Sequence, residues 1–158
     1  MGTSDAKSDF RPVLIACCLA MLAVGDNSTA IMAALPAMRG DLQLGPAQLE
    51  WIVNAYLLAY IIAIPLVGRL SDLIGRTIAF QGSLAVFLAG SAICAVASDL
   101  PSMVAGRAIQ GAGGGALLPV TMALVGDLLP PGRRAAALGL VGAIDTLGWV
   151  LGPLWGAL

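Results

Sequence analysis

The sequence predicts an all-α bundle of transmembrane helices. Of its 158 residues, 59% are hydrophobic and only 11% are charged, whereas soluble domains carry about 25% charged residues. The hydrophobic residues are gathered in long charge-free runs, and a bilayer span needs about 20 mostly apolar residues. These observations exclude a soluble domain and predict five membrane helices, roughly over residues 12–36, 51–69, 77–98, 102–126 and 135–158.

The first helix requires an acidic residue inside the membrane. The charge-free runs 12–25 and 27–38 are each too short to span a bilayer, so they form one helix only if Asp26 lies at membrane depth. The next two runs, 51–68 and 77–98, are long enough by themselves, and they give the second and third helices.

The fourth and fifth helices also contain ionisable residues. The fourth includes Arg107, and the runs 135–144 and 146–158 join into a fifth helix only around Asp145. A charged side chain at a helix centre costs about 2.5 to 3.5 kcal/mol on insertion scales, and it suggests a pathway or relay. Asp26, Arg107 and Asp145 are therefore the candidate proton-coupling residues. The alternative is that Asp26 and Arg107 form a purely structural ion pair.

The basic residues predict the orientation. They gather near the N-terminus and in alternate links, whereas the opposite side carries Arg39 alone. Because Lys and Arg favour the cytoplasmic side, we expect a cytoplasmic tail over residues 1–11 and cytoplasmic links at 68–76 and 127–134. No cleavable signal sequence is evident, so the sequence indicates a multi-pass protein of the cytoplasmic (inner) cell membrane. The residues behind this orientation are Lys7, Arg11, Arg69, Arg76, Arg133 and Arg134.

The chain carries no sign of a catalytic or metal site. It has no histidine, no glycine-rich phosphate loop with its lysine, and no nucleophile beside a base. Cys17, Cys18 and Cys94 lack metal-ligand spacing and are expected to be apolar packing residues. We therefore expect no enzyme activity, no metal and no cofactor, and the net charge of −1 gives no indication of nucleic-acid binding.

Glycines recur at four-residue spacing in the last two helices, within RAIQGAGGGALLP and GWVLGPLWGAL. Small residues at this spacing let helix backbones approach closely in lipid. Pro153 removes a backbone donor and tends to kink a helix, which favours tight packing with a fixed bend over a simple dimer seam. The glycines concerned are Gly111, Gly115, Gly148, Gly152 and Gly156.

The link GRLSDLIGRT places charges between two apolar helices. Gly68 and Gly75 would allow a tight turn, and Asp72 could accept hydrogen bonds from a helix N-terminus. Arg76 could reach Asp127 at the end of the fourth helix. The alternative is that these charges only anchor the topology.

Several of these stretches resemble motifs of the major facilitator superfamily. GRLSDLIGRT is similar to its loop between the second and third helices, and RAIQGAGGG to its fourth-helix motif, here Arg107, Gln110 and Gly111. GWVLGPLWG resembles the fifth-helix motif of its antiporters. DNSTAIMAALP, which begins at Asp26, and WIVNAYLLAY resemble the first and second helices of its fourteen-span drug:proton antiporters. The chain is thus identified as an N-terminal part of such a carrier.

The resemblance implies an architecture and a mechanism. Carriers of this superfamily have twelve or fourteen spans in two halves of inverted three-helix repeats, with the substrate site between the halves. The chain would supply five helices of the N-terminal half, with Asp26 and Arg107 facing the central cavity, and would need the C-terminal helices of the same carrier as partners. The loop with Asp72 and Arg76 would act as a conformational latch, and a proton gradient would drive transport.

Three functions follow from these observations. The first is proton-coupled export of hydrophobic or amphipathic compounds, as in multidrug efflux. The second is lipid export, because residues 106–124, with GALLPVTMAL, resemble an actinobacterial branch that exports lipids such as triacylglycerides. Many drug antiporters have a small or apolar residue where Asp145 stands, so this acid departs from their pattern. The third is a truncated membrane protein that acts only in assembly or regulation.

Overall fold

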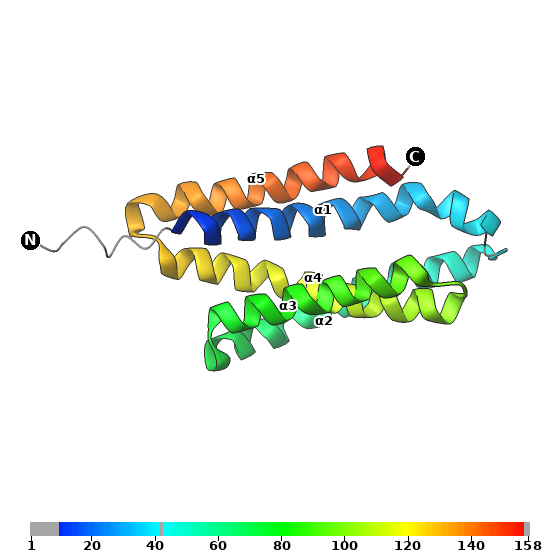
Figure 1. The fold of residues 1–158 in the computed structure, drawn as a ribbon, viewed down its shortest axis with the longest axis horizontal. Coiled ribbons are helices and arrows are strands. Elements are labelled where there is room, and N and C mark those ends of the chain that lie inside the picture. The colour runs from blue at the N-terminus through cyan, green and yellow to red at the C-terminus, as the bar shows by residue number, and fades with distance from the viewer. Residues whose placement is uncertain (1–9, 42, 157–158) are drawn as a thin grey trace, which may run out of the picture.

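The computed structural model describes residues 10–41 and 43–156, which form five helices and no strand. Each helix is long and apolar enough to cross a membrane, which confirms the predicted all-α transmembrane bundle. The helices lie side by side, and their connections alternate between the two ends of the molecule (Figure 1). Lys7 lies outside the described residues. The helices are α1 (Phe10–Asp41), α2 (Pro46–Ile74), α3 (Arg76–Val96), α4 (Leu100–Leu128) and α5 (Pro131–Gly156).

The central helix is α4. It packs along α2 and α3, whereas α1 packs mainly along α5. Figure 1 shows the α1–α5 pair on one side of α4 and the α2 and α3 helices on the other. Consistent with its central position, α4 is the most deeply buried of the five spans.

Glycines on α4 allow its close contact with both neighbours. A Cβ atom on Gly111 would lie 2.9 Å from the Tyr56 Cα atom of α2, and one on Gly113 would lie 2.7 Å from the Phe87 Cα atom of α3. Gly115 lies against the backbone of Tyr60 in the same way, one turn beyond Gly111. Side chains at these positions would force the helices apart. The glycine spacing therefore serves packing inside this chain.

A side-chain cap fixes the start of α4. The carboxylate of Asp99 accepts a hydrogen bond of 2.8 Å from the backbone N–H of Ser102, which satisfies one of the free donors at the helix N-terminus. This backbone hydrogen bond, with a smaller contribution from the Ser102 side chain, lowers the pKa of Asp99 below its usual value. The cap determines where the long span containing Arg107 begins.

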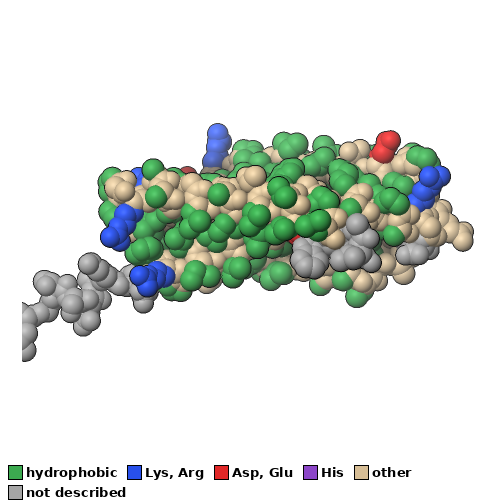
Figure 2. Space-filling model, turned by 90° about the horizontal axis from the view of Figure 1, so that it is seen from above, with side chains coloured by type: hydrophobic (Ala, Val, Ile, Leu, Met, Phe, Trp, Pro, Cys, Tyr) green, Lys and Arg blue, Asp and Glu red, His purple; other side chains and the backbone are tan. Residues whose placement is uncertain are grey.

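The outer surface is apolar. Figure 2 shows hydrophobic side chains over the middle of one face, with Lys and Arg side chains concentrated toward the end where α1 begins. Large hydrophobic side chains such as Ile61, Leu66 and Val150 are more than 60% exposed, as expected for helices whose surroundings are lipid. Cys17 and Cys18 are buried in the main hydrophobic core.

Candidate functional site

A buried arginine lies at the centre of the helix bundle. The Arg107 side chain on α4 is only 2% exposed. Its Nη1 atom donates to the side-chain oxygen of Asn27 on α1 at 2.7 Å and to that of Gln110 at 2.6 Å. Among the described residues, its Nε atom has no hydrogen-bond partner. The positive charge of Arg107 is thus bound by the neutral amide oxygens of Asn27 and Gln110.

An aromatic ring supports the same guanidinium group. The Cζ atom of Arg107 lies 4.2 Å from the ring centroid of Tyr56 on α2, within the range of a cation–π interaction. The Tyr56 hydroxyl is 3.2 Å from the hydroxyl of Ser28 on α1. Because Ser28 already donates to the Val24 carbonyl at 2.8 Å and has a single O–H, the Tyr56 hydroxyl is the donor to Ser28.

The hydrogen bonds continue from Arg107 to α3. The side-chain nitrogen of Gln110 donates to Ser91 at 2.6 Å, and Ser91 donates to the Phe87 carbonyl at 3.0 Å. The contacts around Arg107 therefore join α1, α2, α3 and α4. We call this set the polar cluster, and its members are Asn27, Ser28, Tyr56, Ser91, Arg107 and Gln110.

The structure does not pair Asp26 with Arg107. Within the described residues, Arg107 binds Asn27, the next residue after Asp26, and the recorded ion pairs lie elsewhere. Asp26 is half-buried on α1. Among the described residues, the structural ion pair that the sequence suggested is therefore absent from this conformation, although Asp26 directly precedes Asn27, the residue that Arg107 binds.

The two membrane acids both lie at the contact between α1 and α5. The Asp145 carbonyl lies directly against Gly25, and a Cβ atom on Gly148 would be 2.7 Å from the Asp26 backbone nitrogen. Gly152 lies against the Asp26 carbonyl. Two glycines of the fifth-helix motif thus bring α5 onto the segment of α1 that carries Asp26. Pro153 lies in the last turn of α5, and the surroundings of Gly156 fall outside the described part of the chain.

A second polar site lies at the turn between α2 and α3. Arg76 makes an ion pair of 2.7 Å with Asp72 and another of 3.1 Å with Asp127 at the end of α4. It also donates to the Ser71 hydroxyl at 3.1 Å. Gly75 forms the turn with φ of +95°, a conformation in which only glycine is free of strain.

Two expectations for this link need correction. Gly68 does not take part in the turn, because α2 continues to Ile74 and places Gly68 inside the helix, beside Pro119 of α4. Asp72 does not cap a helix N-terminus, because it lies in the last turn of α2 and binds the side chain of Arg76. The expected contact between Arg76 and Asp127 is present.

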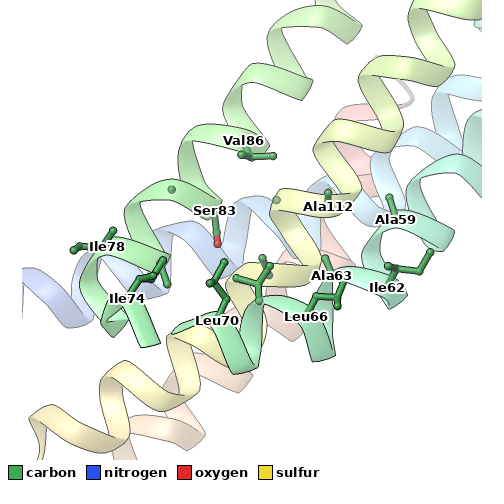
Figure 3. A pocket seen from close by; sticks show the side chains of 15 residues that line it. Ala59, Ile62, Ala63, Leu66, Leu70, Ile74, Ile78, Ser83, Val86 and Ala112 are labelled. Carbon is green, nitrogen blue, oxygen red and sulfur yellow. The ribbon is translucent and has the colours of Figure 1, made fainter. Parts of the chain in front are cut away.

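An apolar groove runs beside this turn. It has a volume of about 640 Å³ and lies between α2 and α3, with α4 behind it. Figure 3 shows its side chains converging from the three helices, with the hydroxyl of Ser83 among aliphatic groups. Such a surface fits hydrocarbon. Its lining includes Ile62, Leu66, Leu70, Ile78, Val86 and Ala112.

Sequence reasoning identified Arg107 and Gln110 but missed four members of the cluster, namely Asn27, Ser28, Tyr56 and Ser91. All four are polar residues within apolar helices. Buried polar groups need hydrogen-bond partners, above all in lipid. Polar residues inside apolar helices were therefore the signal that could have indicated these four.

Comparisons with known proteins identify the family. Residues 16–158 match the model of the Major Facilitator Superfamily. A triacylglyceride transporter of Mycolicibacterium hassiacum is 57% identical over 105 residues, which cover 66% of this chain and 20% of that protein. A triacylglyceride transporter of Mycobacterium tuberculosis strain H37Rv is 51% identical over 112 residues, covering 69% of this chain and 22% of the relative.

A relative named for drug transport matches a longer stretch. Multidrug transporter protein MdtP of Bacillus subtilis is 36% identical over 152 residues, which cover 96% of this chain and 28% of that protein. The chain therefore spans between 20% and 28% of the length of these relatives. Since the family model covers nearly all of its residues, the chain belongs to the major facilitator superfamily.

Proposed function

We propose that this chain forms the first five helices of a proton-coupled antiporter, which exports hydrophobic or amphipathic compounds across the cytoplasmic membrane. The observation that carries the proposal is the polar cluster around buried Arg107, which contacts α1 at the residue next to Asp26. Ionisable residues are costly at membrane depth and mark ion pathways. The likeness to a multidrug transporter supports the substrate class.

Asp26 is the proposed proton carrier. It is half-buried within α1, between Gly25 at the α5 contact and Asn27 at the polar cluster. A movement of either neighbouring helix would change the surroundings of its carboxyl group, and proton affinity follows those surroundings. Proton binding on one side and release on the other would couple the gradient to export without a cofactor. Asp145, at the same helix contact, is the proposed second acid.

The first prediction tests this role in the full-length carrier. Asp26→Asn mimics the permanently protonated state, so substrate binding should persist while a pH gradient no longer drives uptake into inverted vesicles. Asp26→Glu should keep part of the activity with an altered pH profile, because the carboxyl group is retained but displaced. Asp99→Asn is the matched control, since it changes an exposed acid at a helix cap and should leave coupling intact.

Substrate-induced proton release from the purified carrier provides a second measurement. It should disappear in Asp26→Asn and persist in the Asp99 control. Full gradient-driven transport by Asp26→Asn would refute the assignment and move the proton role to Asp145 or to other helices of the carrier.

The turn between α2 and α3 is the proposed latch. Arg76 joins the end of α2 to the end of α4 through Asp72 and Asp127, so ion pairs hold these helix ends together in the present conformation. We place it on the cytoplasmic side because of the basic residues there. Opening toward the cytoplasm would require these pairs to break.

Lipid export is the second candidate. It is favoured by the identity of 57% to a triacylglyceride transporter, against 36% to the multidrug transporter, although over a shorter stretch. The apolar groove between α2 and α3 is also compatible with hydrocarbon chains. Purified full-length carrier in liposomes, supplied with a fluorescent triacylglyceride or a cationic dye, would separate the two substrates. Transport of neither would favour a role in assembly or regulation.

A further inference from the structure

We propose that Tyr56 is a positioning residue for proton coupling: together with Asn27, it holds Arg107 away from Asp26 in this conformation. The inference rests on the proposed function and extends it to residues that the sequence motifs did not identify. It starts from a conflict in the structure. A buried guanidinium group binds a neutral amide, although a carboxylate occupies the adjacent position of the same helix.

The Tyr56 ring is held in place from two directions. Its hydroxyl binds Ser28 on α1, and its backbone lies directly against Gly111 of α4, one turn beyond Arg107. Gly114 leaves room for this hydroxyl, since an added Cβ atom there would lie only 3.1 Å from it. The distance of 4.2 Å between ring and guanidinium is therefore fixed by backbone packing as well as by side-chain contact.

The contacts close a loop through three helices. Arg107 binds Asn27 on α1, Tyr56 binds Ser28, the next residue of α1, and the Tyr56 ring covers the Arg107 guanidinium. Because successive residues of a helix point about 100° apart, we expect pairing with Asp26 to move the guanidinium off the ring. The cation–π contact with Tyr56 then stabilises Arg107 only while it binds Asn27, so this geometry keeps the arginine on the neutral amide.

Among the described residues, this arrangement leaves the Asp26 carboxyl without a guanidinium partner. An arginine beside a carboxylate favours its charged form, so the position of Arg107 decides how readily Asp26 takes up a proton. The other titratable side chains around the cluster are Tyr60 on α2, Cys94 on α3 and Asp145 on α5. None of these carries a positive charge that could replace Arg107.

Tyrosine variants of the full-length carrier test the inference. In Tyr56→Leu the ring is lost, Arg107 is free to pair with Asp26, and the acidic midpoint of the pH profile for gradient-driven uptake should fall by about 1 pH unit or more. Tyr56→Phe keeps the ring and loses only the hydroxyl, so its midpoint should stay near that of the wild type. Trp51→Leu is the control, because it removes an exposed aromatic ring from the same helix.

The outcomes distinguish this inference from the proposed function. An unchanged midpoint in Tyr56→Leu, with coupling abolished in Asp26→Asn, would overturn the positioning role and leave the proton carrier in place. Coupled transport by Asp26→Asn would instead refute the proposed function. If Tyr56→Leu does not insert or transport, Asn27→Ala provides the test instead. It removes the acceptor that holds Arg107, so its midpoint should also fall. A midpoint unchanged in Asn27→Ala would overturn the proposal.

Discussion

At the scale of single residues, Arg76 joins the ends of three helices with contacts that can be broken. Its ion pairs with Asp72 and Asp127 involve carboxylates that are 58% and 64% exposed. Exposed ion pairs contribute only about 0 to 1 kcal/mol each, so the three side chains stabilise the fold little. Contacts of this strength suit a latch, because a conformational change of a few kcal/mol can release them.

The latch predicts a specific result for a conservative substitution. Arg76→Lys keeps the charge but cannot supply the separate donors that reach Asp72, Asp127 and Ser71. Transport by the full-length carrier should fall several-fold while its amount in the membrane is unchanged. Arg69→Lys is the control, because Arg69 is exposed on α2 and should tolerate the change. Equal transport by both variants would reduce the loop to a topology signal.

The sequence identified Arg107 as a candidate site residue but did not predict that it would bind Asn27. An ionisable residue in an apolar run is visible in the sequence alone, as is the glutamine three residues later. Asp26 and Asn27 are adjacent, and successive residues of a helix point about 100° apart. Which of them faces α4 depends on the rotation of α1 about its own axis. That rotation is set by the packing of α1 on α5, which no local pattern encodes.

At the scale of helices, the contact between α1 and α5 depends on glycines of both. Gly25 on α1 and Gly148 and Gly152 on α5 each lie against the backbone of the other helix. The four-residue spacing predicted a close helix contact. It did not indicate which helix would be the partner, because small-residue spacing is equally suited to any neighbour in lipid.

Alanine substitutions on α5 test this packing. In Gly152→Ala the new methyl group would meet Thr29 and the backbone of Asp26, and overpacking of this kind costs roughly 1 to 3 kcal/mol. Gly142→Ala is the matched control on the same helix, because nothing lies within 4 Å of its added Cβ atom. The melting temperature of the purified full-length carrier should fall in Gly152→Ala and stay constant or rise in Gly142→Ala. Equal melting temperatures would show that the α1–α5 contact adapts freely.

At the scale of the whole molecule, the helix pairing fits two inverted three-helix repeats. If α1 corresponds to α4 and α2 to α5, the second helix of each repeat packs on the first helix of the other: α2 lies along α4, and α5 along α1. Asp26 and Arg107 then occupy equivalent helices. Hydropathy predicted five spans, since each is apolar, but it could not predict these pairs because all five spans have similar apolar surfaces.

Orientation in the membrane is a property of the whole chain, and the last prediction concerns it. Basic residues concentrate at the end that holds the α2–α3 and α4–α5 connections (Figure 2), and this end should face the cytoplasm. Single cysteines at exposed positions in the full-length carrier, with its native cysteines replaced, can report it. Leu73→Cys and Gly132→Cys mark the basic end, and Ser98→Cys marks the opposite end. In intact cells an impermeant maleimide should label Ser98→Cys alone, whereas all three should react in permeabilised cells. Labelling of Leu73→Cys and Gly132→Cys without Ser98→Cys would reverse the orientation and place the Arg76 latch on the outer side.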